Sequence, residues 1–319
     1  MQHADFISSF LFSVSVTLPT MLMLILGIFL RTRGFIDDKF CGQATKIIFN
    51  ITLPMLLFQN IVKNPVDYAS QTSVLLLGAS GTLILFLLAE ILAVRFVKQK
   101  DERATFVQAV YRGNNGILGL AFCINAYGDA ALAPASIYAA AMTFLYNILG
   151  VITLSRHLSE GKVSLNRVLL NVLKNPLIIA ITLGVLVNLI SIPLPKTLIT
   201  SGDYLANMTL PLALLCTGAS IDVKAMFKTT GMSLWASLCR VAIAPLFMVL
   251  FAYGFGLSGM ALGILFLMTV TPMAAAAYAM IRAMGGNSTT AANIIGLTSF
   301  GSMFTSSIGL VVLSQLGWI

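Results

Sequence analysis

Apolar residues fill ten long runs of this chain, and short polar segments separate the runs. Each run holds about 20 residues with few charges, the length of helix that crosses a bilayer. A spanning segment is either a helix or a strand of a closed barrel, and these runs are too long and too continuously apolar for barrel strands. The pattern therefore predicts ten membrane-spanning helices, over 7–30, 40–62, 72–97, 104–126, 131–155, 176–194, 203–222, 231–256, 258–283 and 289–315.

A five-residue motif in the second run recurs in the seventh. Residues Asn50 to Pro54 read Asn-Ile-Thr-Leu-Pro, and Asn207 to Pro211 read Asn-Met-Thr-Leu-Pro, 157 positions later. A proline removes the helical hydrogen bond to the carbonyl four residues before it, which belongs to the asparagine in both copies. Each motif therefore predicts a weakened helix with a polar amide at the weak point.

The same shift of 157 places the second to fifth runs on the seventh to tenth, which indicates a duplicated unit. Each unit holds five spans, and an odd number makes the second copy enter the membrane from the opposite side. Inverted repeats of this kind are common among secondary transporters. The sequence thus predicts an all-α protein with a first repeat over 1–155, a second, inverted repeat over 176–319, and a cytoplasmic connection over 156–175 that carries an amphipathic helix.

Composition and charge support a polytopic membrane protein. Hydrophobic residues make up 58% of the 319 residues and charged residues only 9%, against about 25% charged in a soluble domain. The net charge of +8 reflects topology rather than nucleic-acid binding. Basic residues concentrate in loops after the odd-numbered spans, which places both termini outside the cytoplasm. His157 is predicted to lie outside the spans. No nucleophile, phosphate-binding or metal-ligand motif is found in the sequence, so we expect no enzyme, no cofactor and no metal.

The fourth predicted span contains Arg112–Gly116, which reads Arg-Gly-Asn-Asn-Gly, near its centre. Two glycines and two asparagines are unfavourable inside a helix, and unpaired amides are costly in hydrocarbon. Close helix packing through small residues is one interpretation. The two amides favour the other, a break in the helix.

The matched position of the ninth span holds Thr271 followed by Pro272. Thr and Pro in succession predict the N-cap and first residue of a helix, so this span is predicted to stop and restart in mid-membrane. A proline kink without a function is the alternative. Disruptions at matched positions of both repeats favour two broken helices.

Two broken helices would bring two half-helix N-termini to one point near the bilayer midplane. Each N-terminus carries roughly half a positive charge. Asn114, Asn115, Thr269 and Thr271 add neutral donors and acceptors there. Such a crossing is suited to a small anion.

Four ionisable residues lie in or near the predicted spans. Lys46 precedes Asn50 by one helical turn, and two interpretations stay open for it: contact with a passing anion, or extension to the cytoplasmic interface. Arg112 adjoins the first break, where it could bind an anion or line the cytoplasmic entrance. Glu90 and Arg240 lie at similar predicted depth, so an ion pair between them is possible, with a structural role favoured for both.

Four segments resemble the auxin efflux carrier family, with bacterial malonate-type permeases most similar. They are Lys46–Pro54, Arg112–Gly119, Lys174–Ala180 and Pro211–Ser220, and the likeness runs along almost the whole chain. The resemblance implies a ten-helix carrier with crossed helices 4 and 9, in the wider fold of the bile-acid sodium symporters. It also implies a scaffold of spans 1, 2, 6 and 7 and substrates that are organic anions.

Carried over by position, the family's crossover residues are Gly113 to Gly116 and Thr271 with Pro272. Where the family often has a proline after the first crossover, this chain has Ala121. The sequence thus predicts an inner-membrane carrier of small organic anions whose site includes Lys46, Asn50, Arg112 and Asn207 besides the crossover residues. A passive anion channel is the alternative. A homodimer is left open, and lipid is the surrounding medium.

Overall fold

The computed structural model describes residues 6–63, 68–158, 174, 176–190, 193–221, 231–283 and 286–319. Within these ranges the chain is helical, and the only β pairing is one isolated bridge. The helices of the first half are α1 (Phe6–Thr32), α2 (Asp38–Ile47), η1 (Ile48–Thr52), α3 (Leu53–Lys63), α4 (Tyr68–Phe96), α5 (Lys100–Tyr111), η2 (Asn115–Gly119), α6 (Leu120–Tyr127), η3 (Gly128–Ala131) and α7 (Leu132–Leu158). Those of the second half are α9 (Pro176–Ile190), α10 (Lys196–Ser220), α12 (Gly231–Leu238), η4 (Cys239–Ile243), α13 (Ala244–Gly254), α14 (Gly259–Thr269), α15 (Ala275–Ala283) and α16 (Ser288–Gln315).

Six stretches of the described chain are long and apolar enough to cross a membrane. The apolar helices Ile178–Ile190 and Gly259–Thr269 are shorter. One of the six stretches, Asn115–Leu158, runs through two of the predicted spans, because the backbone stays mostly helical from η2 to α7. The protein is therefore a multi-pass helical membrane protein, and the count of ten spans stays a prediction. The amphipathic helix predicted at 163–174 falls almost entirely outside the described residues.

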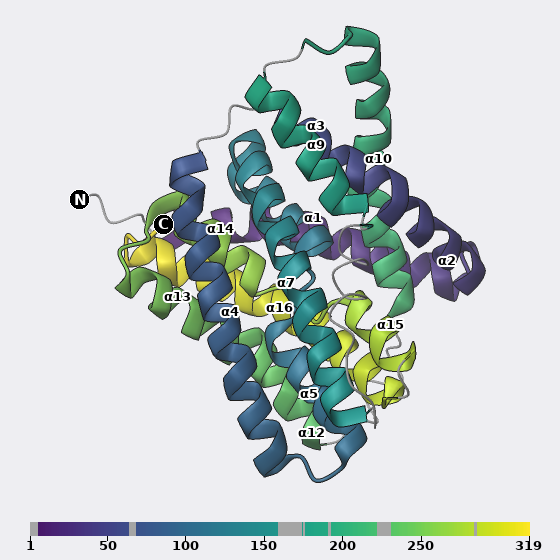
Figure 1. Cartoon of the computed structure of the whole chain (residues 1–319), viewed down its shortest axis with the longest axis vertical. Coiled ribbons are helices and arrows are strands. Elements are labelled where there is room, and N and C mark those ends of the chain that lie inside the picture. The colour runs from purple at the N-terminus through teal and green to yellow at the C-terminus, as the bar shows by residue number, and fades with distance from the viewer. Residues whose placement is uncertain are drawn as a thin grey trace.

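Helix contacts outline two groups, which are joined by α1 because it also packs against α16 and α6. In one group α10 packs against α1, α2 and α3, and α3 packs against α9. In the other, α4 packs against α5, α7 and α13, and α12 packs against α16 and α5. Figure 1 shows α3, α9 and α10 in the upper part of the molecule and α5 and α12 in the lower part, with α4 running from the upper left to the bottom. The first group comprises the spans that the family resemblance assigns to a scaffold.

The two proline motifs do not break their helices. Before Pro54 the chain forms the π-helical turn η1, and the Asn50 side chain donates to the Lys46 carbonyl oxygen (2.7 Å). π-helical turns are rare and occur mostly as single turns within α-helices, as η1 does between α2 and α3. Pro211 lies inside the continuous helix α10. The predicted weak points are therefore local distortions at most, because neighbouring residues keep the backbone helical.

The breaks lie where the glycine–asparagine run and the Thr-Pro pair predicted them. Helix α5 ends at Tyr111, and the backbone is extended at Arg112 before η2 begins at Asn115. Helix α14 ends at Thr269, and α15 begins at Ala275. The predicted N-cap at Thr271 is wrong, because residues 272–274 pair with the first break instead of starting the helix.

Candidate functional site

The two breaks cross and bond to each other through their backbones. The Asn114 N–H donates to the Pro272 carbonyl oxygen (2.9 Å), and the Ala274 N–H donates to the Arg112 carbonyl oxygen (3.1 Å). Gly113 and Met273 form the antiparallel bridge between these bonds. Each break leaves backbone groups without helical partners, which must be satisfied inside a membrane. The crossing supplies partners for four of these groups.

The crossing is too tight for a side chain at Gly113. A Cβ atom there would lie 2.5 Å from the Thr271 hydroxyl, 2.8 Å from the Asn115 amide oxygen and 2.9 Å from an Arg240 nitrogen. At Gly116 the nearest atom to a Cβ would be 3.8 Å away, on Leu53, which is ordinary contact. The two glycines of the motif thus have different roles, and only Gly113 is required for the close approach.

Arg240, from the π-helical turn η4, holds the C-terminal ends of both half-helices. Its guanidinium donates to the carbonyl oxygens of Thr271 (2.9 Å), Val110 (3.0 Å) and Thr269. The residue is only 1% exposed. The last carbonyls of a helix lack internal partners and carry partial negative charge, so a cation is favourable there. One side chain therefore joins α5 to α14.

The ion pair that the sequence left possible between Glu90 and Arg240 does not form, because each side chain has other partners. Glu90 instead accepts hydrogen bonds from Thr153 and pairs with His157 and Arg156, all on α7. Similar depth in the membrane suggested the ion pair, but the Glu90 carboxylate lies against α7 and the Arg240 guanidinium lies at the two breaks. The structural role that the sequence favoured for Arg240 agrees with its three carbonyl partners.

Arg112 is also buried, at 3% exposure, and its partners are neutral. One terminal nitrogen donates to the Asn147 amide oxygen (2.8 Å), and the other donates to the Gln108 amide oxygen (3.1 Å) and lies 2.9 Å from the Met280 sulfur. Neither Arg112 nor Arg240 forms an ion pair with a carboxylate in the part of the chain that the structure describes. Two buried guanidinium groups without a carboxylate partner among the described residues thus flank the crossing.

The two asparagines of the first break differ in their bonding. Asn115 donates to the Tyr146 hydroxyl (3.2 Å), and its amide oxygen lies 3.3 Å from the Thr271 hydroxyl. The Asn114 side chain, 9% exposed, makes no hydrogen bond with any described residue. Thr269 donates to a carbonyl within its own helix (2.7 Å). Asn114 therefore has both amide functions available for a ligand, whereas Asn115 fixes the geometry of the crossing.

The remaining predicted site residues lie elsewhere. Lys46 and Asn50 are exposed on α2 and η1 and bond to each other rather than to the crossing. Asn207 lines a second feature, a cavity of 510 Å³ lined mainly by residues of α3 and α10. Lys63 and Asp203, which form an ion pair, are among its lining residues.

The sequence did not reveal two contributors to these sites. Tyr146 contacts Asn115 through its hydroxyl and Arg112 through its carbonyl, and the Lys63–Asp203 pair joins residues 140 positions apart. The position of Arg240 inside a predicted span indicated that the residue has a role. Its carbonyl partners lie 29 to 130 positions away in the sequence, so the sequence alone did not identify them.

Comparison with known proteins decides the family. Residues 12–309 match the family described as membrane transport protein. This chain belongs to that family. A curated relative, an uncharacterized transporter of Methanocaldococcus jannaschii, is 24% identical over 241 residues, which cover 73% of this chain and 76% of the relative.

Membership of the membrane transport family confirms the resemblance to auxin efflux carriers that the motifs carried. The match includes both breaks and Arg240, so the crossing lies inside the family's shared region. The function is therefore to be sought in transport rather than in a reaction.

Proposed function

We propose that this protein is a secondary carrier of small organic anions, such as mono- or dicarboxylates, and that the substrate binds at the crossing of the two broken helices. The observation that carries the proposal is the pair of buried guanidinium groups, Arg112 and Arg240, without a carboxylate partner among the described residues. A buried charge without an ion-pair partner is costly in a membrane interior, and such residues commonly mark substrate pathways. An anionic substrate would supply the missing charge.

The dipoles of the half-helices favour the same sign. Arg240 occupies the negative, C-terminal ends of α5 and α14, while the N-termini of η2 and α15 begin at the breaks. Each N-terminus favours an anion by about 0.3–1 kcal/mol when exposed, and by up to about 2 kcal/mol when partly buried. Asn114, with an unbonded amide next to this region, is the proposed contact for a carboxylate oxygen.

The helix bounds support two repeats that span the membrane ten times. When 157 is added to the residue numbers, the segment from the start of α2 to the end of α3 begins one residue before α10 and ends at the last residue of α10. The same shift makes α7 start one residue after α16 and end on its last residue, and makes α5 end one residue before α14. The antiparallel bridge at the crossing is consistent with copies of opposite direction.

A carrier fits the burial of the crossing better than a channel does. Asn115 and Thr271 are 3% and 0% exposed, whereas an open pore wets its narrowest polar residues. In alternating access, one bundle would move against the other while the site stays with the crossing. We further propose that the protein lies in the bacterial-type inner membrane with both termini outside the cytoplasm, as the loop charges predict.

Counterflow in proteoliposomes tests the proposal. Vesicles loaded with an unlabelled mono- or dicarboxylate should accumulate the labelled acid transiently, with saturation, and the Asn114→Leu variant should not. The Ser80→Ala variant is the control, because this hydroxyl bonds only within its own helix, to Leu76 (2.7 Å) and Leu77. Linear, unsaturable flux without exchange would instead indicate the channel.

A further inference from the structure

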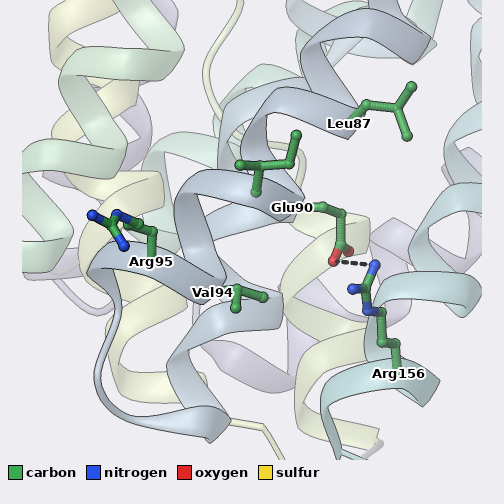
Figure 2. A pocket seen from close by; sticks show the side chains of 6 residues that line it. Leu87, Glu90, Val94, Arg95 and Arg156 are labelled. Atoms are coloured by element: carbon green, nitrogen blue, oxygen red, sulfur yellow. Dashed lines mark ion pairs between the residues drawn. The ribbon is translucent and has the colours of Figure 1, made fainter.

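A cavity of 570 Å³ opens beside the last turns of α4, and no residue of either break lines it. Figure 2 shows it, with Glu90 and Arg156 pointing toward each other from α4 and α7. Its lining combines apolar and charged side chains, namely Leu87, Glu90, Ile91, Val94, Arg95 and Arg156. Nothing in the proposed transport site uses these residues.

The apolar part of the lining is a stripe along one side of α4. Leu87, Ile91 and Val94 are spaced by three or four residues, so they follow one another along the helix. They are 58%, 66% and 48% exposed. Because α4 is one of the helices long and apolar enough to span the membrane, hydrocarbon chains are the medium that such a stripe meets.

The charged part of the lining is held in place by buried groups. Glu90 is 4% exposed and accepts a hydrogen bond from Thr153, and its carboxylate lies 2.9 Å from the His157 ring. One nitrogen of Arg156 is 3.3 Å from the same carboxylate, while the Arg156 side chain is 60% exposed. His157 was predicted outside the spans but is nearly buried, at 6%. The carboxylate thus orients Arg156 and leaves its other N–H groups available.

Arg95 adds a second cation at the opposite edge of the cavity, where its side chain points away from Arg156 (Figure 2). It follows Ile91 by one turn, is exposed, and forms no ion pair with a described residue. Glu90 offsets the charge of Arg156, so Arg95 leaves the cavity with a net positive charge. The cavity is therefore apolar along its length and cationic at the ends of α4 and α7.

We propose that this cavity binds an anionic phospholipid, with the phosphate at Arg95 and an acyl chain along Ile91 and Leu87. Basic pockets between membrane helices bind acidic headgroups in this way. A soluble anion would leave the apolar stripe unused. In the orientation that the loop charges predict, the lipid comes from the cytoplasmic leaflet. The inference depends on the membrane location and not on the transported substrate.

Native mass spectrometry of the purified full-length protein tests this proposal. Phosphatidylglycerol should bind more tightly than phosphatidylcholine of the same chains. Arg95→Gln should weaken the binding of phosphatidylglycerol about fivefold and leave the binding of phosphatidylcholine unchanged, since one basic group near an anionic headgroup contributes about that much affinity. Arg33→Gln is the matched control, because Arg33 is exposed at the end of α1, outside the cavity. It should bind both lipids as the wild type does.

Two further variants keep the test independent of one arginine. Glu90→Gln removes the competing carboxylate and keeps an acceptor for Thr153 and His157, so phosphatidylglycerol should bind more tightly. Ile91→Trp should fill the stripe and weaken both lipids. Equal binding of the two lipids by the wild type, an equal loss in Arg33→Gln, or displacement of phosphatidylglycerol by inorganic phosphate alone would overturn the proposal. Transport of organic acids would be unaffected by that failure.

Discussion

The two breaks occupy matched positions of the chain but contribute different chemistry. The first break presents side chains, namely a buried cation at Arg112 and two amides at Asn114 and Asn115. The second presents backbone: the Pro272 carbonyl accepts from Asn114, and the Thr271 carbonyl accepts from Arg240. The two halves of the crossing thus share its geometry and differ in the groups that they present. The first half is suited to contact a ligand, and the second half is suited to hold the first in place.

Arg240→Met should have the largest effect on stability, because the support of both breaks depends on this side chain. Three buried carbonyl oxygens would each lose a charged donor, and a buried acceptor without a partner costs about 1–3 kcal/mol. The melting temperature of the purified Arg240→Met variant should fall strongly, and Arg240→Lys should recover part of the loss.

Arg33→Met serves as the control for this experiment, because the Arg33 guanidinium lies over the Phe29 ring (5.2 Å) on an exposed helix end. Its change should stay within about 0.5 kcal/mol. A wild-type melting temperature for Arg240→Met would show that the second break does not rely on Arg240.

Gly113→Ala should rank second, because the added methyl group would meet three atoms within 3 Å at the crossing. Overpacking of this kind costs about 1–3 kcal/mol. Gly116→Ala is the matched control, since its nearest neighbour lies at 3.8 Å. The melting temperature and the transport rate should both decline for Gly113→Ala and stay near the wild-type values for Gly116→Ala. Equal tolerance of both substitutions would mean that the breaks approach less closely than the bridge indicates.

Asn114→Leu should have the smallest effect on stability and a full effect on transport. Its amide makes no hydrogen bond with described residues, so its loss removes no internal contact. Asn115→Leu should lower both properties, because that amide joins Tyr146 and Thr271. Parallel melting and counterflow measurements separate the two cases. If Asn114→Leu transports normally, the first break is not the ligand-contacting half.

Local signals in the sequence predicted where the helices break. The Gly-Asn-Asn-Gly run and the Thr-Pro pair both disfavour a continuous helix, and the structure interrupts α5 and α14 at these places. The restart of the second helix was misplaced, because the bonds of Asn114 and Ala274 across the crossing extend Pro272 and Met273. A single sequence does not contain that pairing.

Long-range partners also escaped the sequence. Depth along a span suggested Glu90 for Arg240, but the carboxylate lies against α7 and the guanidinium lies at the breaks. The proline motifs were predicted as weak points of their helices. The π-helical turn η1 precedes Pro54 without a break, and α10 continues through Pro211. The residue types near the breaks indicated a polar site at the crossing. Which side chains come together there depends on tertiary packing, which the sequence alone does not give.

The sign of the charge that the crossing prefers is the most direct test of the account. Purified protein should be stabilised against heating by mono- and dicarboxylates, and Asn114→Leu should abolish this response. Arg112→Gln should weaken the binding of dianions more than that of monoanions, because it removes one of the two buried guanidinium groups at the crossing. Matched organic amines should have no effect. Stabilisation by the amines, with no response to any carboxylate, would contradict the proposal that the crossing binds anions.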